Sequence, residues 1–317
     1  MSPRALAAVL VFLGAACVLP FVLTNYHTFQ AALVLVYAIA LLGLNILTGY
    51  NGQISLGHGA FYAIGAYCAA MLMDQGGFPY WGTVPVAGAV CLLAGFLFGL
   101  PALRLEGLYL ALATFALGVS MPQILKYHLL EKWTGGVQGI TIAKPDPPAF
   151  LANVLNADQW LYFFVLAVAV IMFVLGWNLL RGRVGRALVA IRDHHTAADV
   201  MGINTALYKS LAFGVSAMYT GVVGALGAIA VQFVAPDSFN VFLSITFLVG
   251  IVVGGLASLS GALYGALFIE FVPNIADELS KAAPWAIFGV VLIVFVYAMP
   301  TGVAGAIRMI SLRRKST

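Results

Sequence analysis

Polar side chains that could do chemistry are rare in this sequence, and one group of them lies between residues 51 and 59. Polar groups within a membrane usually face a water-filled cavity or a partner, because lipid offers them no hydrogen bonds. A translocation path or a gate is therefore one interpretation of this group. The other is a packing surface, since small residues let a second helix approach closely. Both interpretations concern Asn51, Gln53, Ser55, Gly57, His58 and Gly59.

Two ionisable side chains, His58 and Glu270, lie within apolar stretches, where charge is costly unless it is paired or solvated. Glu270 comes late in its apolar run, and we expect it near the outer membrane face, where water reaches it. No carboxylate or histidine stands three or four residues from it to form a proton-coupling pair. For His58 we favour a hydrogen bond to a neighbouring backbone carbonyl over a role in transport.

The largest concentration of charge lies in the segment 181–209. Arg181, Arg183 and Arg186 follow an apolar run, which is typical of a cytoplasmic anchor near phosphate headgroups. After them, residues 187–192 are compatible with a helix. An idle, solvated linker is the alternative, but a linker does not need apolar residues at helical spacing.

A second short helix is expected after residue 193. Asp193 is predicted to cap it, its body would cover 196–201, and Gly202 fits its end. The pattern therefore predicts a helical hairpin beneath the membrane, with Asp193 and Asp199 exposed.

Composition places these groups in a membrane protein. Of the 317 residues, 62% are hydrophobic and 8% are charged, and the mean hydropathy is +1.02. Soluble domains carry roughly 45–50% apolar and about 25% charged residues. The net charge of +4 does not indicate nucleic-acid binding, because the basic residues lie at the ends of apolar runs and in one loop.

Motifs of enzymes are absent from the sequence. Lys209-Ser210 lacks the glycine that directly precedes the lysine of a phosphate-binding loop, and no metalloprotease or nucleophile-elbow motif is present. Cys17, Cys68 and Cys91 lie within apolar runs without the spacing of a metal site or a disulfide framework. We therefore predict no catalytic residue and no metal site.

Apolar runs long enough to cross a bilayer core of roughly 30 Å recur along the chain. The run 241–272 is too long for one helix and contains glycines and serines over 254–261, so we expect two helices there. About ten membrane-spanning helices with both termini in the cytoplasm then leave four of the 15 basic residues outside, as the positive-inside rule prefers. The expected runs are 5–23, 29–48, 54–73, 83–103, 107–125, 160–180, 209–232, the two halves of 241–272, and 285–305.

The predicted fold class is accordingly an all-α, polytopic helical membrane bundle. Residues 1–317 form a single transmembrane domain in this prediction, with a cytoplasmic loop at about 181–209 and a periplasmic loop at about 126–159. The latter contains paired glycines and several prolines, which favour a loop over a span. Within the run 54–73, Ser55, Gly59 and Ala63 would share one helix face.

The sequence resembles the family of LivM-type permeases, the membrane subunits of bacterial ABC importers for branched-chain amino acids. The resemblance covers nearly the whole chain and rests on GLNILTGYNGQISLGHGAFYAIGAY (43–67), TGGVQGI (134–140), GRALVAIRDHHTAADVMGIN (185–204), YKSLAFGVSAMYTGVVGALGA (208–228) and LVGIVVGGLASLSGALYGA (248–266). One departure is the pair His194-His195, where family members usually carry an acidic or amide residue followed by glutamate.

The resemblance implies a location in the bacterial inner membrane, the function and the partners. This chain would pair with a second, related permease and two ATPase subunits, and a periplasmic binding protein would deliver the amino acid. ATP and Mg²⁺ would be held by the ATPases, and no cofactor by this chain. The segment 185–204 would couple the ATPase to transport through Arg186, Ile191, Arg192, Asp193, Ala197, Ala198, Asp199 and Gly202.

Other functions stay open at this point. Relatives in the same family handle urea, short amides or aromatic acids, and this chain alone does not separate those substrates from leucine. An ion-coupled secondary transporter would need His58 and Glu270 to act together without ATP. A purely structural membrane subunit would tolerate changes in the segment 185–204.

Overall fold

The structure, a computed structural model, describes residues 3–102, 105, 107–148, 154–281 and 283–316. It is mainly helical, as predicted. The elements are α1 (Pro3–Val22), α2 (Asn25–Asn45), the π-helix η1 (Ile46–Tyr50), α3 (His58–Asp74), α4 (Tyr80–Ala102), α5 (Leu108–Leu125), α6 (Glu131–Thr134), β1 (Ile140–Thr141), α7 (Ala157–Arg181), α8 (Arg183–Asp193), α9 (His195–Val200), α10 (Thr205–Val231), β2 (Phe233–Val234), the 3₁₀-helix η2 (Pro236–Phe239), α11 (Val241–Gly254), α12 (Leu259–Leu279), α13 (Pro284–Ala298) and α14 (Gly302–Ser316).

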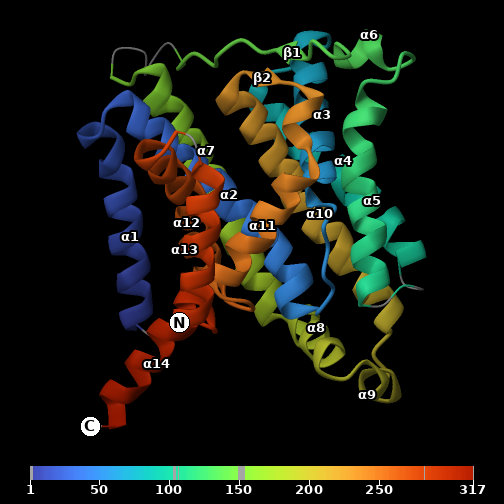
Figure 1. The fold of residues 1–317 in the computed structure, drawn as a ribbon, viewed down its shortest axis with the longest axis vertical. Helices are drawn as coiled ribbons and strands as arrows, with labels where there is room; N and C mark the ends of the chain where they lie inside the picture. Colours follow the sequence, from blue (N-terminus) through green and yellow to red (C-terminus); the bar gives the residue numbers. More distant parts are fainter. Residues whose placement is uncertain (1–2, 103–104, 106, 149–153, 282, 317) are drawn as a thin grey trace.

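Seven helices among the described residues are long and apolar enough to cross a membrane, and Leu10–Val22 and Val241–Gly254 are shorter apolar helices. The long ones run side by side along the vertical direction of Figure 1. At the lower end lie α8, α9 and α14, and at the upper end lie α6, β1 and β2. The chain is therefore a polytopic helical protein with a distinct set of connections at each end.

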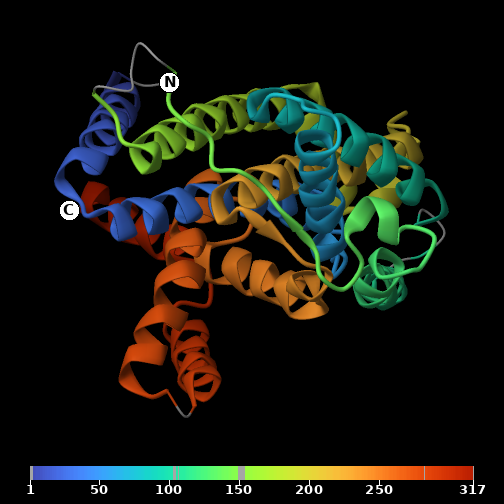
Figure 2. The same ribbon diagram turned by 90° about the horizontal axis from the view of Figure 1, so that it is seen from above.

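The core of the bundle is formed by α2 and α10. In these two spans 78% and 83% of the most apolar window is buried, compared with 11% in Pro284–Met309. Small residues allow the close packing that this burial requires. A Cβ added at Gly65 of α3 would overlap the carbonyl group of Gly221 in α10. Figure 2 shows α12 and α13 projecting away from the rest of the bundle, which leaves the α13 surface outside this core.

Polar side chains mark where several helices begin. The side chains of Asn204, Asn240 and Ser258 accept hydrogen bonds from backbone N–H groups in the first turns of α10, α11 and α12. Asn156 and Gln159 form a reciprocal capping box at the start of α7. These side chains satisfy N–H groups that have no partner within the helix.

The expected division of the run 241–272 is confirmed, because α11 ends at Gly254 and α12 begins at Leu259. Gly255 has φ of +113°, a backbone conformation that glycine adopts more easily than other residues. Ala257 in the same connection also has a positive φ, of +55°. The expected run 285–305 is interrupted, because α13 ends at Ala298 and α14 begins at Gly302. Predicted helix ends elsewhere shift by a few residues.

The predicted start of the third helix is wrong. Residues 54–57 are not helical, because side chains take up their backbone N–H groups: Leu56 N–H donates to Thr114 Oγ1 at 2.9 Å and Gly57 N–H to Ser55 Oγ at 3.3 Å. Ser55 therefore does not share a helix face with Gly59 and Ala63.

The loop 126–159 contains more structure than predicted, although residues 149–153 lie outside the described part. Besides α6, it contributes β1, which pairs in antiparallel fashion with β2: Ile140 lies opposite Val234 and Thr141 opposite Phe233. This pairing joins the connection after α5 to the connection after α10 at the upper end (Figure 1).

Candidate functional site

The charged segment 181–209 folds as a helical hairpin at the lower end of the molecule (Figure 1). It comprises α8 and α9, and it joins α7 to α10. Gly202 ends the hairpin with φ of +83°, and its N–H donates to the Asp199 carbonyl at 2.9 Å. The prediction of two short helices followed by a glycine stop is confirmed.

The predicted cap at Asp193 is wrong. Asp193 is the last residue of α8, and extended His194 precedes α9 without a side-chain cap. The Asp193 carboxylate instead accepts hydrogen bonds from Nε and Nη2 of Arg192, at 3.0 and 2.9 Å. Because this guanidinium already occupies it, the carboxylate is not directed at the N–H groups of α9. Asp199 accepts a hydrogen bond from Thr205 Oγ1 at 2.8 Å.

The predicted coupling residues divide by burial. Ile191 and Ala198 are buried and attach the hairpin to the bundle. The side chains left exposed by this arrangement are those of Arg186, Arg192, Asp193, Ala197 and Asp199.

Two further residues of the hairpin were missed from the sequence. Val200 and Met201 are 84% and 81% exposed at the end of α9, a high value for apolar side chains on a polar segment. The signal was present, since an apolar pair directly before a glycine stop has no core to join. Two adjacent apolar side chains are thus left uncovered at the tip of the hairpin.

Arg192 also connects the hairpin to the membrane-embedded part. Its Nη1 donates to the Gly49 carbonyl, at the end of η1, over 2.9 Å. A Cβ added at Gly52 would lie 3.0 Å from Arg192 Cγ, so the side chain runs closely along residues 49–52. Arg186, by contrast, donates to the Arg181 carbonyl within its own segment, at 3.3 Å. Both bonds leave α8, but that of Arg186 ends on the adjoining last residue of α7, whereas that of Arg192 reaches η1, far away in the sequence.

The start of η1 is tied to a second helix break through Asn45, the last residue of α2, which the sequence did not single out. Asn45 Nδ2 donates to the Ser258 carbonyl at 2.8 Å, and Ala257 N–H donates to Asn45 Oδ1 at 2.9 Å. Both groups belong to the connection between α11 and α12. Short π-helical segments are frequent at functional sites. The hairpin, the end of α2 and the break at 255–258 therefore form one bonded series.

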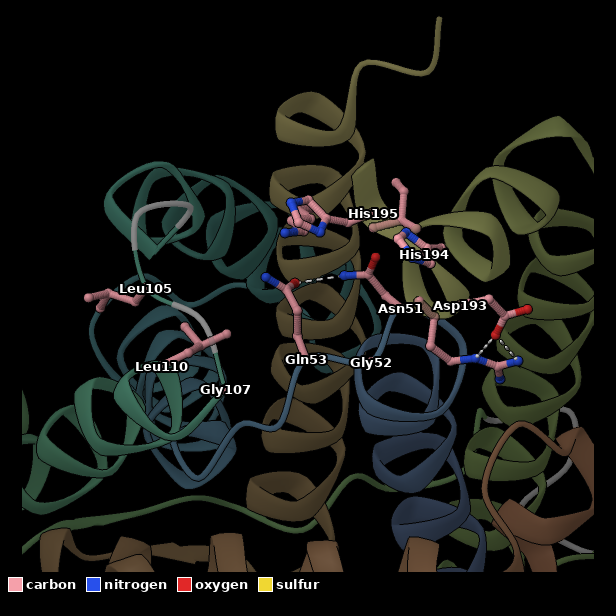
Figure 3. A pocket seen from close by; sticks show the side chains of 12 residues that line it. Asn51, Gly52, Gln53, Leu105, Gly107, Leu110, Asp193, His194 and His195 are labelled. Carbon is pink, nitrogen blue, oxygen red and sulfur yellow. Dashed lines mark hydrogen bonds and ion pairs between the residues drawn. The ribbon is translucent and has the colours of Figure 1, made fainter. Parts of the chain in front are cut away.

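The predicted polar group at 51–59 splits into two parts. Asn51 and Gln53, with Gly52 between them, line a pocket of about 390 Å³ next to the hairpin (Figure 3). Ser55, Gly57, His58 and Gly59 lie within the packed bundle instead. A Cβ at Gly57 would come within 2.8 Å of the Thr114 carbonyl oxygen, and Gly59 N–H donates to Ser244 Oγ at 2.8 Å. The packing interpretation is therefore confirmed for Ser55, Gly57, His58 and Gly59, whereas a translocation path or a gate at Asn51 and Gln53 stays a prediction.

The expected hydrogen bond from His58 to a backbone carbonyl is wrong, because two hydroxyl groups hold the imidazole instead. Its Nε2 lies 2.7 Å from Ser216 Oγ, and its Nδ1 lies 3.0 Å from Ser55 Oγ. The Ser216 hydroxyl donates its hydrogen bond to the Gly43 carbonyl at 2.6 Å. Because a hydroxyl has a single proton to donate, Ser216 Oγ accepts a hydrogen bond from His58 Nε2–H. The Ser55 hydroxyl then donates to Nδ1. This chain of bonds satisfies the imidazole in its neutral form and joins α3, α10 and α2.

Glu270 is buried at 8% exposure, so solvation at the membrane face does not explain it. Asn274 Nδ2 donates to its backbone carbonyl at 2.6 Å and lies 3.4 Å from its Oε1. The hydrogen-bond partners recorded for Glu270 and His58 are separate, and neither is the other. The geometry does not join them into the pair that an ion-coupled transporter would need.

Comparisons with known proteins agree with this geometry. The family model described as branched-chain amino acid transport system / permease component matches residues 27–299. The high-affinity branched-chain amino acid transport system permease protein LivM of Escherichia coli (strain K12) is 31% identical over 303 residues, covering 88% of this chain and 70% of the relative.

Two other relatives are more distant. The permease protein BraD of Pseudomonas aeruginosa is 23% identical over 290 residues, and LivH of Escherichia coli (strain K12) is 23% identical over 292 residues. Each alignment covers 85% of this chain and 91% of the relative. No solved structure gives a significant match to this chain.

Proposed function

This chain belongs to the family of permease components of branched-chain amino acid transport systems and is a permease subunit of an ABC importer, and from that premise we propose how it crosses the membrane and is driven. Ten helices cross the bilayer in this proposal: the seven long apolar helices together with α1, α3 and α11. Both termini then lie in the cytoplasm of a bacterium, with α8, α9 and α14. The grouping of these elements at one end supports the proposal (Figure 1).

The partners follow from the family. This subunit pairs with a second, related permease, as the presence of both LivM and LivH among the relatives supports. Two ATPase subunits bind and hydrolyse ATP with Mg²⁺, and a periplasmic binding protein delivers a branched-chain amino acid. This chain contributes the path and the attachment point for the ATPase.

One observation carries the coupling mechanism: the exposed hairpin α8–α9 is hydrogen-bonded through Arg192 to the end of η1. In the proposal the ATPase binds the apolar tip of the hairpin, which is formed by Val200 and Met201. ATP-driven closure displaces the hairpin, and Arg192 transmits the displacement to Gly49. Asn45 extends it to the break between α11 and α12. An ATPase can shift the permease between its states only by contacting them differently, and the hairpin supplies those contacts.

The docking step is tested by changing the tip from apolar to charged. We expect Val200→Asp combined with Met201→Asp to abolish co-purification of the ATPase with the permease, because the carboxylates would be desolvated in the partner's cleft. Val137→Asp, at a 68% exposed apolar residue in the loop at the opposite end, is the matched control and should leave co-purification intact. Normal assembly of the tip variant would refute this docking role.

A further inference from the structure

A small pocket lies between α12 and α13, near the connection that joins them. Its volume is about 210 Å³, and its lining residues are Pro273, Asp277, Pro284, Trp285 and Phe288. Small-molecule sites occupy roughly 300–1,000 Å³, so this space fits a part of a ligand better than a complete solute. Because α12 and α13 project away from the rest of the bundle (Figure 2), the pocket lies at the periphery of the chain.

One wall of the pocket is aromatic. The ring centroids of Trp285 and Phe288 are 6.2 Å apart with an interplanar angle of 81°, and the Phe268 centroid lies 5.8 Å from that of Phe288. The first of these is an edge-to-face contact, which stabilises the orientation of the indole. Phe288 is buried, whereas Trp285 is 70% exposed. An indole that is open in this way attracts a cation through its π electrons.

The charge of the pocket is negative. Asp277 is the charged residue of the lining, and it is exposed. In the described part of the chain, no ion pair or hydrogen bond involves its carboxylate. Glu278 and Lys281 follow it and cancel each other, so residues 277–281 carry one net negative charge. The prolines of the lining have no N–H group to offer an anion. The pocket therefore favours a cation that donates hydrogen bonds.

In the proposed topology the pocket lies at the level of the outer lipid headgroups. Asp277 belongs to the last turn of α12, and Trp285 belongs to the first turn of α13. α12 begins after the break at 255–258, which is bonded to the end of α2 near the hairpin, so its last turn lies at the opposite face of the bilayer. Tryptophan is enriched at this boundary between lipid and water.

α13 continues from the pocket with an apolar surface. Val290, Ile293 and Val294 are between 61% and 70% exposed. Only 11% of the most apolar window of Pro284–Met309 is buried within the chain. Lipid acyl chains are as apolar as these side chains and lie along such a surface. The headgroup of a lipid seated on α13 reaches the pocket, whereas a water-soluble amine would leave that surface bare.

We propose that the pocket binds the primary ammonium group of phosphatidylethanolamine in the outer leaflet. The ammonium donates hydrogen bonds to the Asp277 carboxylate and lies against the Trp285 ring. Lys281, in the connection between the two helices, neutralises the lipid phosphate. The acyl chains run along α13, so that one lipid contacts both helices and stabilises this projecting pair. The inference rests on the proposed crossing of the membrane by α12 and α13, and not on the transport cycle.

Lipid binding to the complete importer tests this assignment. The delipidated complex in detergent is titrated with phosphatidylethanolamine, and native mass spectrometry gives the dissociation constant of the first bound lipid. We expect Asp277→Asn to weaken this binding about tenfold, because a charge-assisted hydrogen bond is lost. Glu278→Gln removes the same charge from the next residue, which is not part of the lining, and should keep the wild-type affinity. Equal affinities of the wild type and Asp277→Asn would overturn the proposal.

A series of headgroups identifies the group that is recognised, and it needs only the wild-type complex. N-acetylated phosphatidylethanolamine, which keeps the acyl chains but lacks the ammonium, and phosphatidylglycerol should each bind about tenfold more weakly. Equal binding of these lipids would overturn the proposal, whether or not a variant folds. Phosphoethanolamine and leucine at millimolar concentration should not compete with the lipid. Competition by either would identify a soluble amine as the ligand and reject the lipid.

The failure of this inference is separable from failure of the proposed function. ATP-dependent leucine uptake by the same complex in proteoliposomes measures the latter, whereas lipid binding is measured without ATP. Uptake without a preference for phosphatidylethanolamine would reject the lipid site alone. A preference that is present in the isolated permease subunit and absent from the complete importer would show that the second permease covers the pocket, and would also reject the lipid site.

Discussion

At one end of the segment 51–59, Asn51 leaves a buried oxygen without a partner beside an open pocket, whereas at the other end Ser55 and His58 are bonded within packed helices. The two ends carry similar polar side chains and lie a few residues apart. They differ in what the neighbouring helices provide. α2 and α10 supply Gly43 and Ser216 to the His58 end, while the Asn51 end faces the hairpin. Polar residues at the His58 end therefore join three helices, whereas at the Asn51 end the bundle leaves one buried oxygen without a partner.

The largest expected effect concerns the packed end. We expect His58→Leu to lower the free energy of unfolding by about 2 kcal/mol, because two buried hydroxyls lose a partner. The thermal unfolding midpoint in detergent measures this loss. His27→Leu, an exposed histidine at the start of α2, is the control and should change little. Equal stability of the two variants would remove the distinction between the two ends.

The next prediction separates the effect of the hydrogen bond between Arg192 and Gly49 from the effect of positive charge on the hairpin. Arg192→Ala should reduce leucine transported per ATP about tenfold, the equivalent of roughly 1.4 kcal/mol, because a charge-assisted bond to Gly49 is lost. Uptake and phosphate release in proteoliposomes give the ratio. Arg186→Ala removes the same charge from the same helix without that bond and should keep the ratio near the wild-type value. Matching losses in both variants would assign the effect to charge.

A smaller effect concerns the end of the hairpin. Gly202→Ala and Gly77→Ala should each cost about 1 kcal/mol, since both glycines have positive φ, +83° and +60°, and open space around the missing Cβ. Only the change at Gly202 should weaken ATPase binding, because Gly77 lies in the connection before α4. Binding of the ATPase to detergent-solubilised permease, measured by titration, compares the two. Equal affinities would show that the geometry of the hairpin's end does not matter for docking.

The smallest effect is expected at the open end. Asn51→Leu should leave thermal stability unchanged within about 0.5 kcal/mol, since its oxygen has no bond to lose and water in the pocket can replace Asn51 at Gln53. The unfolding midpoint, read beside that of His58→Leu, measures it. A loss as large as that of His58→Leu would mean that Asn51 is a packing residue as well.

Local features of the fold were predictable because their cause is local. Gly202 ends the hairpin, and the glycine-rich stretch 254–261 divides two helices, since such residues alter the backbone wherever they stand. The start of α3 was not predictable. Its apolar pattern extends back to residue 54, and the interruption depends on Thr114, far away in the sequence.

The site itself was predictable only in part. The hairpin and the polar group at 51–59 stand out by composition. Their contact in space could not be predicted from the sequence. It depends on hydrogen bonds between residues more than a hundred positions apart, namely the bond from Arg192 to Gly49 and the bonds between Asn45 and residues 257 and 258. Val200 and Met201 form an apolar pair directly before Gly202, which is a signal in the sequence, but the extent of their exposure emerges only from the fold.

The division of labour between this chain and its partners is tested most directly by leucine uptake into proteoliposomes, with the binding protein present and the ATPase subunits included or left out. We predict ATP-dependent uptake when the ATPases are present and no uptake above the protein-free background when they are omitted. Concentrative uptake by the permeases without any ATPase would contradict the account.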